Sequence, residues 1–474
     1  MRLFLAVRIM SQFSTSQPVS SKIHVRATSG RFSRWRWAMV WLTQLLFYGL
    51  PWLSWNDRQA VLFDLDARRF YLFELALYPQ DFIYLALLLV ICALGLFFVT
   101  AVAGRVWCGF SCPQTVYTAI YLWVERRFEG DRSARMRLDA APWSATKLAR
   151  KAGKQATWIA IGLWTGFTFV GYFTPIQTLG GLVLHLDTGP WETFWIGCYG
   201  LATYGNAGYL REQVCKHMCP YGRFQSVMFD RDTLIIGYDQ ARGEPRGSRP
   251  RGSDAQALGL GDCINCTLCV QVCPTGIDIR NGLQIDCIGC AACIDACDAV
   301  MDKIDRPRGL IRYSSQTGLE QGWGRDRVLQ RTLRPRVLVY GALLLAIGAA
   351  FVIGLLQRSP FRVDVMRDRG VLARMVEQGA VENAYRLQIM NSLESVQRYR
   401  IGVTGPQGLT LVASPSIELA PMAERTVTAT VRLAGQQAAA LAGQALTIHF
   451  AVEPLGGDQA GRQVVEKSSF LVPR

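Results

Sequence analysis

The chain has 474 residues, 50% of them hydrophobic, and its 51 Lys and Arg outnumber its 36 Asp and Glu to give a formal charge of +15. This length allows two or three domains. The apolar residues gather in a few long uncharged runs, a distribution typical of a membrane protein. Because basic residues flank those runs, we attribute the charge to membrane topology and expect no binding of nucleic acid.

Five uncharged runs are long enough to cross a bilayer core of roughly 30 Å, which takes about 20 helical residues. The third run is longer than one span and contains Pro175, so we expect its end to form an outer loop. We expect no signal peptide, since the apolar stretch from Leu3 to Val7 is too short. The runs lie between Arg36 and Asp57, Asp81 and Arg105, Lys154 and Asp187, Glu192 and Arg211, and Arg336 and Arg358.

The basic residues also predict the orientation of the chain. The tail of residues 1–35 and the segment Gly104–Lys154 are basic, so both should lie on the cytoplasmic side. The uncharged stretch Val106–Val124 should be a helix at the inner interface, because a further span there would place the later basic loops outside. The predicted order is a membrane domain of four spans (36–210), a cytoplasmic segment (211–335, core 258–305), a fifth transmembrane helix (336–358) and a periplasmic domain (359–474).

Eight of the 14 cysteines form a repeated motif with the spacing C-x2-C-x2-C-x3-C. The first copy is followed by Pro274, whereas the second is followed by Asp298. Bacterial ferredoxins with two [4Fe–4S] clusters use this spacing, and in them the fourth cysteine binds the other cluster. We therefore predict one cluster on Cys263, Cys266, Cys269 and Cys297, and a second on Cys287, Cys290, Cys293 and Cys273.

Zinc sites and disulfides are the alternatives for these eight cysteines. Zinc takes four ligands in two pairs, which leaves the third cysteine of each copy without a purpose. Disulfides are disfavoured on the reducing cytoplasmic side. Two iron–sulfur clusters therefore account best for the motif.

Two further cysteine pairs share a second motif, C-x3-C-P. Cys108 and Cys112 precede Pro113 after the second run, and Cys215 and Cys219 precede Pro220 after the fourth. Proline disfavours a helical conformation in the residue before it and is well placed as the first residue of the next helix. We therefore expect Cys112 and Cys219 at helix N-termini, where the helix dipole favours the thiolate.

The duplication suggests that two hairpins deliver four thiols to the same membrane depth. Such a soft site suits Cu(I), zinc or another cluster, although the thiols could also be buried small side chains without a role. His217 lies between the second pair and could be a further ligand or an interfacial residue. Cys92 and Cys198 are unpaired within the runs, and we assign them no role.

Other features are less specific. Only His185 of the four histidines lies near a predicted span, so we expect no transmembrane haem. The stretch from Arg242 to Gly252 is typical of a solvated linker. Beyond the fifth run, Tyr385–Asn391 and Thr426–Leu433 alternate apolar and polar residues, as half-buried strands do. We expect a C-terminal β-sandwich of immunoglobulin type that binds or positions a partner.

The order of spans, the two C-x3-C-P motifs, the paired cluster motifs and the terminal β-domain resemble the cytochrome c oxidase accessory proteins of the FixG/RdxA/CcoG type. The resemblance covers roughly residues 30–474. It is carried by the stretches Gly104-Arg-Val-Trp-Cys-Gly, Arg211-Glu-Gln-Val-Cys, Gly261-Asp-Cys and Val270-Gln-Val-Cys-Pro-Thr-Gly-Ile-Asp-Ile.

The resemblance implies a multi-pass protein of the bacterial inner membrane that is needed for maturation of the cbb-type haem–copper oxidase. It further implies reduction of Cu(II) to Cu(I) for the oxidase copper centre, and thus a cupric reductase. The candidate copper ligands, which would also be the catalytic residues, are then Cys108, Cys112, Cys215 and Cys219. Implied partners are the lipid bilayer, oxidase subunits or copper-delivery proteins, and an unidentified cytoplasmic electron donor.

A second class of function stays open, namely a polyferredoxin electron carrier or an assembly scaffold without copper chemistry. Such a protein would dock to a respiratory oxidoreductase through its β-domain. The membrane polyferredoxins of nitrate and nitrous-oxide respiration combine similar motifs.

Overall fold

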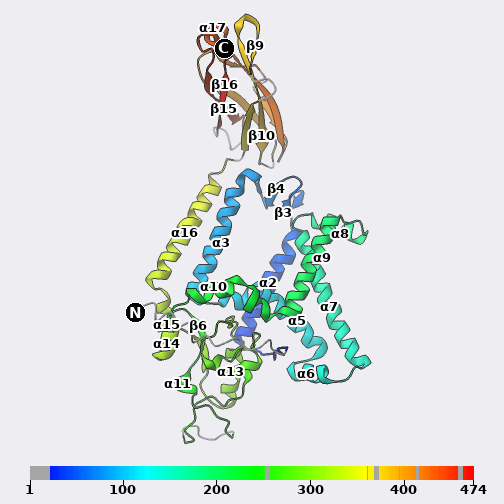
Figure 1. The fold of residues 1–474 in the computed structure, drawn as a ribbon, viewed down its shortest axis with the longest axis vertical. Helices are drawn as coiled ribbons and strands as arrows, with labels where there is room; N and C mark the ends of the chain where they lie inside the picture. Colours follow the sequence, from blue (N-terminus) through cyan, green and yellow to red (C-terminus); the bar gives the residue numbers. More distant parts are fainter. Residues whose placement is uncertain are drawn as a thin grey trace. The chain divides into compact units, whose positions relative to one another are not determined.

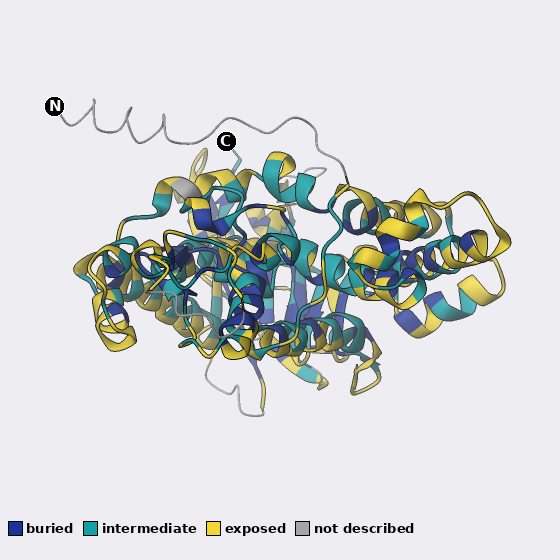
Figure 2. Ribbon diagram, turned by 90° about the horizontal axis from the view of Figure 1, so that it is seen from below, coloured by how far each residue is buried: buried dark blue, intermediate teal, exposed yellow. Residues whose placement is uncertain are grey.

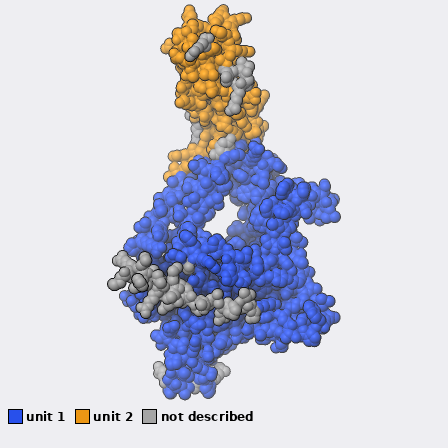
Figure 3. All heavy atoms as spheres, viewed as in Figure 1, with its two compact units in different colours: residues 1–351 blue, residues 352–474 orange. Residues whose placement is uncertain are grey.

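The computed structural model describes residues 22–250, 257–359, 361–367, 373–393, 395–412, 416–456 and 463–473. The chain divides into two compact units, and the boundary between them lies between Phe351 and Val352 (Figure 3). The first unit is mainly helical and holds all the cysteines, whereas the second is built of strands (Figure 1).

Long helices occupy the five uncharged runs of the sequence. They are α2 (Arg31–Gly49), α3 (Phe82–Ala103), α7 (Ala145–Val170), α9 (Pro190–Gly205) and α16 (Pro335–Leu356). Among the described residues, two helices are long and apolar enough to cross a membrane, α3 and α16, each of 22 residues. The helix α9 has only 16 residues, and α2 and α7 begin with basic residues. By length and composition, two of the five expected transmembrane helices are therefore found among the described residues.

Large apolar side chains are exposed on all of these helices (Figure 2). Examples are Leu45 on α2, Leu89 on α3, Trp164 on α7, Leu201 on α9 and Leu345 on α16. Water-soluble proteins rarely expose contiguous apolar surface of this extent. The helical part of the first unit thus has apolar faces that other molecules must cover.

The helices α7 and α9 approach each other closely at glycines. A Cβ atom added to Gly162 would lie 2.7 Å from the carbonyl oxygen of Gly200, and one added to Gly166 would lie 2.2 Å from that of Ile196. Gly162 and Gly166 are four residues apart and so lie on the same face of α7. This is the pattern by which small residues allow helix backbones to touch within membranes.

Three loop regions differ from the sequence-based expectation. The stretch Val106–Val124 is not one helix but two, α4 (Val106–Phe110) and α5 (Pro113–Glu129), because Pro113 has no N–H to continue α4 and starts α5 instead. The end of the third run is not a loop but the helix α8 (Ile176–Leu184). The stretch between the first two runs contains short strands, namely β1 (Ser54–Trp55), β2 (Arg58–Gln59), β3 (Val61–Asp64), β4 (Arg69–Leu72) and β5 (Leu75–Leu77).

The cysteine-rich segment is closed by a pair of antiparallel strands, β6 (Ile235–Tyr238) and β7 (Ile311–Ser314). Between these strands lie α11 (Gln240–Gly243), α12 (Leu268–Gln271) and α13 (Ala292–Lys303). Arg242 in α11 donates a hydrogen bond of 2.6 Å to Asp262, so the start of the expected linker is part of the packed domain. The remaining elements are α6 (Arg132–Ala140), η3 (Asn206–Leu210), η4 (Val214–Met218), α10 (Pro220–Met228), η5 (Ile279–Asn281), α14 (Gln316–Glu320) and α15 (Arg325–Thr332).

The second unit is a sandwich of two antiparallel sheets with strand orders β12-β14-β10-β8 and β13-β11-β15-β16. The predicted strands are confirmed, since β10 covers Val381–Asn391 and pairs with β14 (Glu424–Leu433). Buried Tyr385 and Leu387 of one sheet face buried Phe450 and Phe470 of the other. The other elements are β8 (Phe361–Arg367), β9 (Arg374–Met375), η6 (Glu377–Gly379), β11 (Gln397–Thr404), β12 (Leu409–Leu411), β13 (Ser416–Leu419), α17 (Gly435–Ala440), β15 (Ala445–Pro454) and β16 (Val464–Leu471).

The contact between α7 and α9 can be tested by adding a side chain to it. Gly166→Leu should destabilise the protein by about 1–3 kcal/mol, because the added atoms cannot fit against the backbone of α9. Gly197→Leu is the matched control, since a Cβ atom on Gly197 of α9 meets nothing within 4 Å. The measurement is thermal unfolding in detergent, and equal unfolding temperatures for the two variants would contradict the packing.

Candidate functional site

Two small pockets inside the cysteine-rich segment are lined by the eight cysteines of the repeated motif. Three cysteines of one copy and the fourth of the other copy line each pocket. The first pocket is lined by Cys263, Cys266, Cys269 and Cys297. The second is lined by Cys273, Cys287, Cys290 and Cys293, and Cys269 also reaches its wall.

The backbone curls around each pocket in the same way. Asn265 and Gly289 follow the first cysteine of their motif copies by two residues, and both have a positive φ. Thr267 and Ala291, which follow the second cysteine, also have a positive φ and precede the first residues of α12 and α13. Successive left-handed residues fold the chain into a tight arc, so the spacing of the cysteines becomes a concave surface. The equivalent backbone conformation makes the two copies structural repeats.

The thiols in the pockets are deeply buried. Burial raises the pKa of Cys269 to about 11 and the pKa values of Cys287 and Cys297 to about 12. Neighbouring thiols raise the pKa of Cys297 further, because each thiolate disfavours the next. Thiolates gathered in so apolar a place need a strong positive charge beside them, which iron ions supply. The residues of both pockets therefore fit iron–sulfur clusters in composition and placement.

The four cysteines of the C-x3-C-P motifs lie together in a second place, the four-cysteine region. Cys108 lies on α4 and Cys215 on η4, while Cys112 and Cys219 directly precede α5 and α10. All four are partly buried. Pro113 and Pro220 are the first residues of their helices, as the motif predicts. The duplicated sequence thus forms two similar turns whose thiols face a common region.

The thiols of the four-cysteine region interact electrostatically with one another. Burial raises the pKa of Cys215 to about 12, and Cys112, Cys108 and Cys219 contribute to the rise. Burial likewise raises the pKa of Cys108 to about 11, although its thiol donates a hydrogen bond of 3.4 Å to Gln225. Among the described residues, no group of three or more His, Cys, Asp or Glu side chains is placed to hold a single metal ion.

At Cys112 the expected effect of the helix N-terminus is opposed by burial. Burial raises the pKa of Cys112, while the backbone N–H groups of Gln114 and Thr115 at the start of α5 lower it, as expected for a helix N-terminus. Desolvation of the charged sulfur is the larger of the two effects at this position.

The four-cysteine region touches the second pocket directly. Cys108 and Cys215 pack against a buried apolar group that includes Ile288 and Cys290. A Cβ atom added to Gly109 would lie 2.7 Å from the Cα and N atoms of Cys290, so the two backbones are in contact there. Nearly 180 residues separate Cys108 from Cys287 along the chain, so no local pattern predicts this contact.

The other residues singled out in the sequence lie elsewhere. Cys92 on α3 and Cys198 on α9 are exposed. His217 lies on η4 beside Cys215, and its side chain is exposed. None of these three is brought into the pockets described above.

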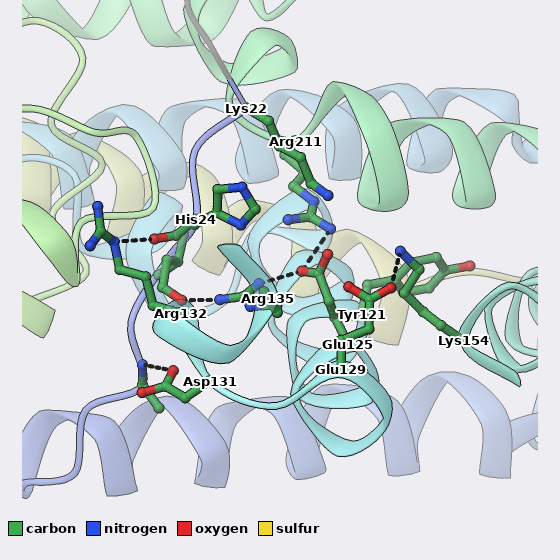
Figure 4. Close-up of polar contacts among 12 residues, drawn as sticks. Lys22, His24, Tyr121, Glu125, Glu129, Asp131, Arg132, Arg135, Lys154 and Arg211 are labelled. Carbon is green, nitrogen blue, oxygen red and sulfur yellow. Dashed lines mark hydrogen bonds and ion pairs between the residues drawn. The ribbon is translucent and has the colours of Figure 1, made fainter. Parts of the chain in front are cut away.

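A buried ionic network holds the two C-x3-C-P turns in place (Figure 4). Glu125 of α5 is fully buried and accepts contacts from Arg135 at 2.6 Å and from Arg211 at 3.1 Å. Arg211 lies between η3 and η4, just before Cys215. Gln114 at the start of α5 donates hydrogen bonds of 2.9 and 3.1 Å to the carbonyl oxygens of Asn206 and Arg211. The first turn is thereby fixed to the second.

The same network extends to α7 and to the N-terminal tail. Glu129, one turn after Glu125, pairs with Lys154 of α7 at 2.8 Å. Arg135 also donates to the carbonyl oxygen of Val25, and Arg132 donates to that of His24 at 3.0 Å. Sequence reasoning missed this network. The available signal was two acids four residues apart at the end of a long uncharged stretch.

The network should make stability depend on Glu125. Burial alone would raise the pKa of Glu125, but Arg211 and Arg135 outweigh it and hold the pKa below the ordinary 4.5. A carboxyl group whose pKa is lower in the folded state stabilises the fold at pH values above its unfolded pKa. That contribution is lost as the pH falls through the folded pKa. Glu125→Ala should cost about 3–5 kcal/mol at pH 7, because it leaves two buried arginines without a partner.

The measurement is unfolding in detergent from pH 7 to about pH 3, because the contribution of Glu125 is lost only below its unfolded pKa of 4.5. The unaltered protein should lose stability towards about pH 3 more steeply than the variant does. Glu320→Ala is the control, because its pair with Arg231 is largely exposed and should matter little. A Glu125→Ala variant as stable as the control would show that the network does not hold the fold.

Three segments of the chain match known protein families. Residues 210–316 match a family described as a 4Fe-4S dicluster domain, and residues 85–129 match a 4Fe-4S binding domain. Residues 351–473 match the Ig-like fold at the C-terminus of FixG. The first match contains the eight cysteines of the repeated motif together with Cys215 and Cys219, and the second contains Cys108 and Cys112.

Whole-chain relatives are similar over most of their length. The chain is 40% identical to the nitrogen fixation protein FixG of Rhizobium meliloti (strain 1021) over 421 residues, which are 82% of this chain and 80% of FixG. It is 38% identical to the proteins RdxB and RdxA of Cereibacter sphaeroides, which it covers by 95% and 97%. A crystal structure of a FixG-related protein from Vibrio parahaemolyticus aligns with 24% of this chain at 23% identity and a TM-score of 0.21. The chain therefore belongs to the family of FixG, RdxA and RdxB, and it is an iron–sulfur electron-transfer protein of the FixG type.

Proposed function

We propose that this protein takes electrons from a cytoplasmic donor, passes them through two [4Fe–4S] clusters, and reduces Cu(II) to Cu(I) at the four-cysteine region. The Cu(I) would then serve assembly of a cbb-type cytochrome c oxidase. The observation that supports this most is the backbone contact between Gly109 and Cys290, which joins the four-cysteine region to the second cluster pocket.

In this proposal the ligands follow the lining of the two pockets. Cys263, Cys266, Cys269 and Cys297 hold one cluster, and Cys273, Cys287, Cys290 and Cys293 hold the other. When bound, such clusters supply one electron at a time. Cys269 reaches the wall of both pockets, so the two clusters share a boundary. A continuous series of centres would thus run from the cytoplasmic segment to the four-cysteine region.

The four thiols suit copper as the electron acceptor. Thiolate sulfur stabilises Cu(I) over Cu(II), so an electron that arrives there has a favourable destination. Each Cu(II) takes one electron from a reduced cluster and becomes Cu(I), and no other bond changes. Because the pKa values of Cys108 and Cys215 are raised, copper binding must displace protons from these thiols. The metal would also draw the thiols closer together than they lie without it.

The proposed setting is a bacterial inner membrane, crossed five times. The exposed apolar faces of α2, α3, α7, α9 and α16 are surfaces that lipid would cover. With the basic tail inside, the cysteine-rich segment lies in the cytoplasm and the β-sandwich in the periplasm. Oxidase subunits or copper-delivery proteins are the proposed partners there.

A second function is a polyferredoxin carrier without copper chemistry. It is favoured by one finding, namely that residues 85–129, which contain Cys108 and Cys112, match a 4Fe-4S binding domain. The four-cysteine region would then bind iron and not copper. The iron content of cysteine variants separates the two functions.

The copper function predicts a specific pattern of losses. Anaerobically purified protein should contain about eight irons, because two clusters hold four each. Replacing Cys108 and Cys215 together by Ser should abolish Cu(II) reduction while the iron content and the EPR signals stay unchanged. Cys263→Ser should remove a cluster and also stop reduction, because electrons no longer arrive.

Controls and contrary outcomes are clear for these variants. Cys92→Ser and Cys198→Ser alter exposed thiols and should change neither iron nor copper reduction. Loss of iron from the Cys108 and Cys215 double variant would favour the carrier. Normal copper reduction by that variant would place the acceptor site elsewhere.

The membrane topology can be tested with fused reporters. A periplasmic reporter after Arg474 should be active, and a cytoplasmic reporter in the loop near Gly247 should be active, because an odd number of spans separates the N-terminus from the β-sandwich. If reporters fused at the two positions show that both lie on the same side of the membrane, five spans are contradicted.

A further inference from the structure

Arg105 lies at the junction of the second pocket and the four-cysteine region. Its side chain is only 8% exposed, although it carries a full positive charge. The guanidinium donates to the carbonyl oxygen of Ile285 and, at 3.3 Å, to that of Cys287. The other terminal nitrogen donates to the carbonyl oxygen of Gly222 in α10. One side chain therefore links the loop that begins the second pocket to the second C-x3-C-P turn.

The backbone at Arg105 fits the same loop. Gly289 has φ +70°, and a Cβ atom there would lie 2.9 Å from the carbonyl oxygen of Arg105. The neighbouring contact of Gly109 with Cys290 leaves no room for a side chain either. Glycine at both positions allows the two turns to touch through their backbones. The link made by the Arg105 side chain thus reinforces a close backbone contact.

The charge of Arg105 acts on both groups of thiols. It interacts electrostatically with Cys108 and Cys215 of the four-cysteine region and with Cys287 of the second pocket. Its Nε atom is buried and has no hydrogen-bond partner among the described residues, so one donor remains available to a sulfur atom. A second cation, Arg36, acts on Cys290 from α2. A positive charge beside a cluster favours the reduced form, which carries one more negative charge.

We infer that Arg105 is a positioning residue that holds the second cluster against the four-cysteine region and raises the reduction potential of that cluster. The inference rests on the proposed electron transfer to copper, because it names the residue that keeps donor and acceptor together. The planar fork of arginine is needed, since a lysine cannot reach Ile285, Cys287 and Gly222 at once.

Arg211 provides a matched control. It stands at the corresponding place before the second motif and is also 8% exposed. Its guanidinium pairs with Glu125 and donates to the carbonyl oxygen of Gly208 at 2.9 Å, so its partners lie outside the loop of the second pocket. Replacing it removes an equally buried arginine but leaves the hydrogen bonds of Arg105 to Ile285, Cys287 and Gly222 in place.

The test is an EPR-monitored redox titration of the full-length protein in detergent, together with anaerobic Cu(II) reduction. Arg105→Gln should keep about eight irons. It should lower the reduction potential of one cluster by at least about 59 mV, which is a tenfold change in the equilibrium constant for one electron. Its rate of Cu(II) reduction should fall at least tenfold. Arg105→Lys should change the equilibrium constant for reduction of the cluster by less than threefold. It should still reduce Cu(II) at least tenfold more slowly. Arg211→Gln should leave both cluster potentials unchanged.

The inference is overturned if Arg105→Gln changes neither potential, or if Arg211→Gln shifts a potential as much. If Arg105→Gln loses iron, the variants Gly109→Ala and Arg105→Lys test the inference in its place. Both keep a positive charge at residue 105 but weaken the junction. Unchanged rates in both variants would then refute a positioning role. The potentials are read without copper, so a failure of Cu(II) reduction in the unaltered protein would sink the proposed function and leave the electrostatic test standing.

Discussion

The close backbone contact between Gly109 and Cys290 is the constraint on which the rest of the site depends. It requires that two loops, far apart in the sequence, approach without any side chain between them. One loop belongs to the first C-x3-C-P turn and the other to the second cluster pocket. In the proposed electron transfer, a contact of this kind keeps the donor and the acceptor close together. The surrounding structure serves to maintain it.

Buried polar contacts flank the packed backbones on either side of the turns. On one side Arg105 links the pocket loop to α10, and on the other Arg211 and Glu125 link η4 to α5. Buried ion pairs add little net stability over well-packed apolar residues, but losing one partner is costly. Such pairs therefore select one arrangement of the turns.

The cysteine-rich segment is also fixed to the first long helix. Asp295, between two cysteines of α13, accepts hydrogen bonds from the backbone N–H groups of Phe32 at 3.0 Å and Ser33 at 2.6 Å. These are N–H groups at the start of α2, which otherwise have no partner within the helix. A side chain of the cysteine-rich segment thus caps the first long helix. The two parts of the first unit are joined there by hydrogen bonds between the Asp295 side chain and the backbone of α2.

The sequence by itself determined the local chemistry. Motif spacing predicted the arc of three cysteines in each copy, because each arc is only a few residues long and its backbone conformation is local. The grouping with the fourth cysteine of the other copy came from the bacterial ferredoxins that share this spacing. Proline after each C-x3-C pair predicted the starts of α5 and α10, and alternation predicted β10 and β14. Only the tertiary structure decided which segments of the chain contact one another. The contact of Cys290 with Gly109, the junction at Arg105 and the network around Glu125 all join segments far apart in the chain, and no local pattern encodes such distances.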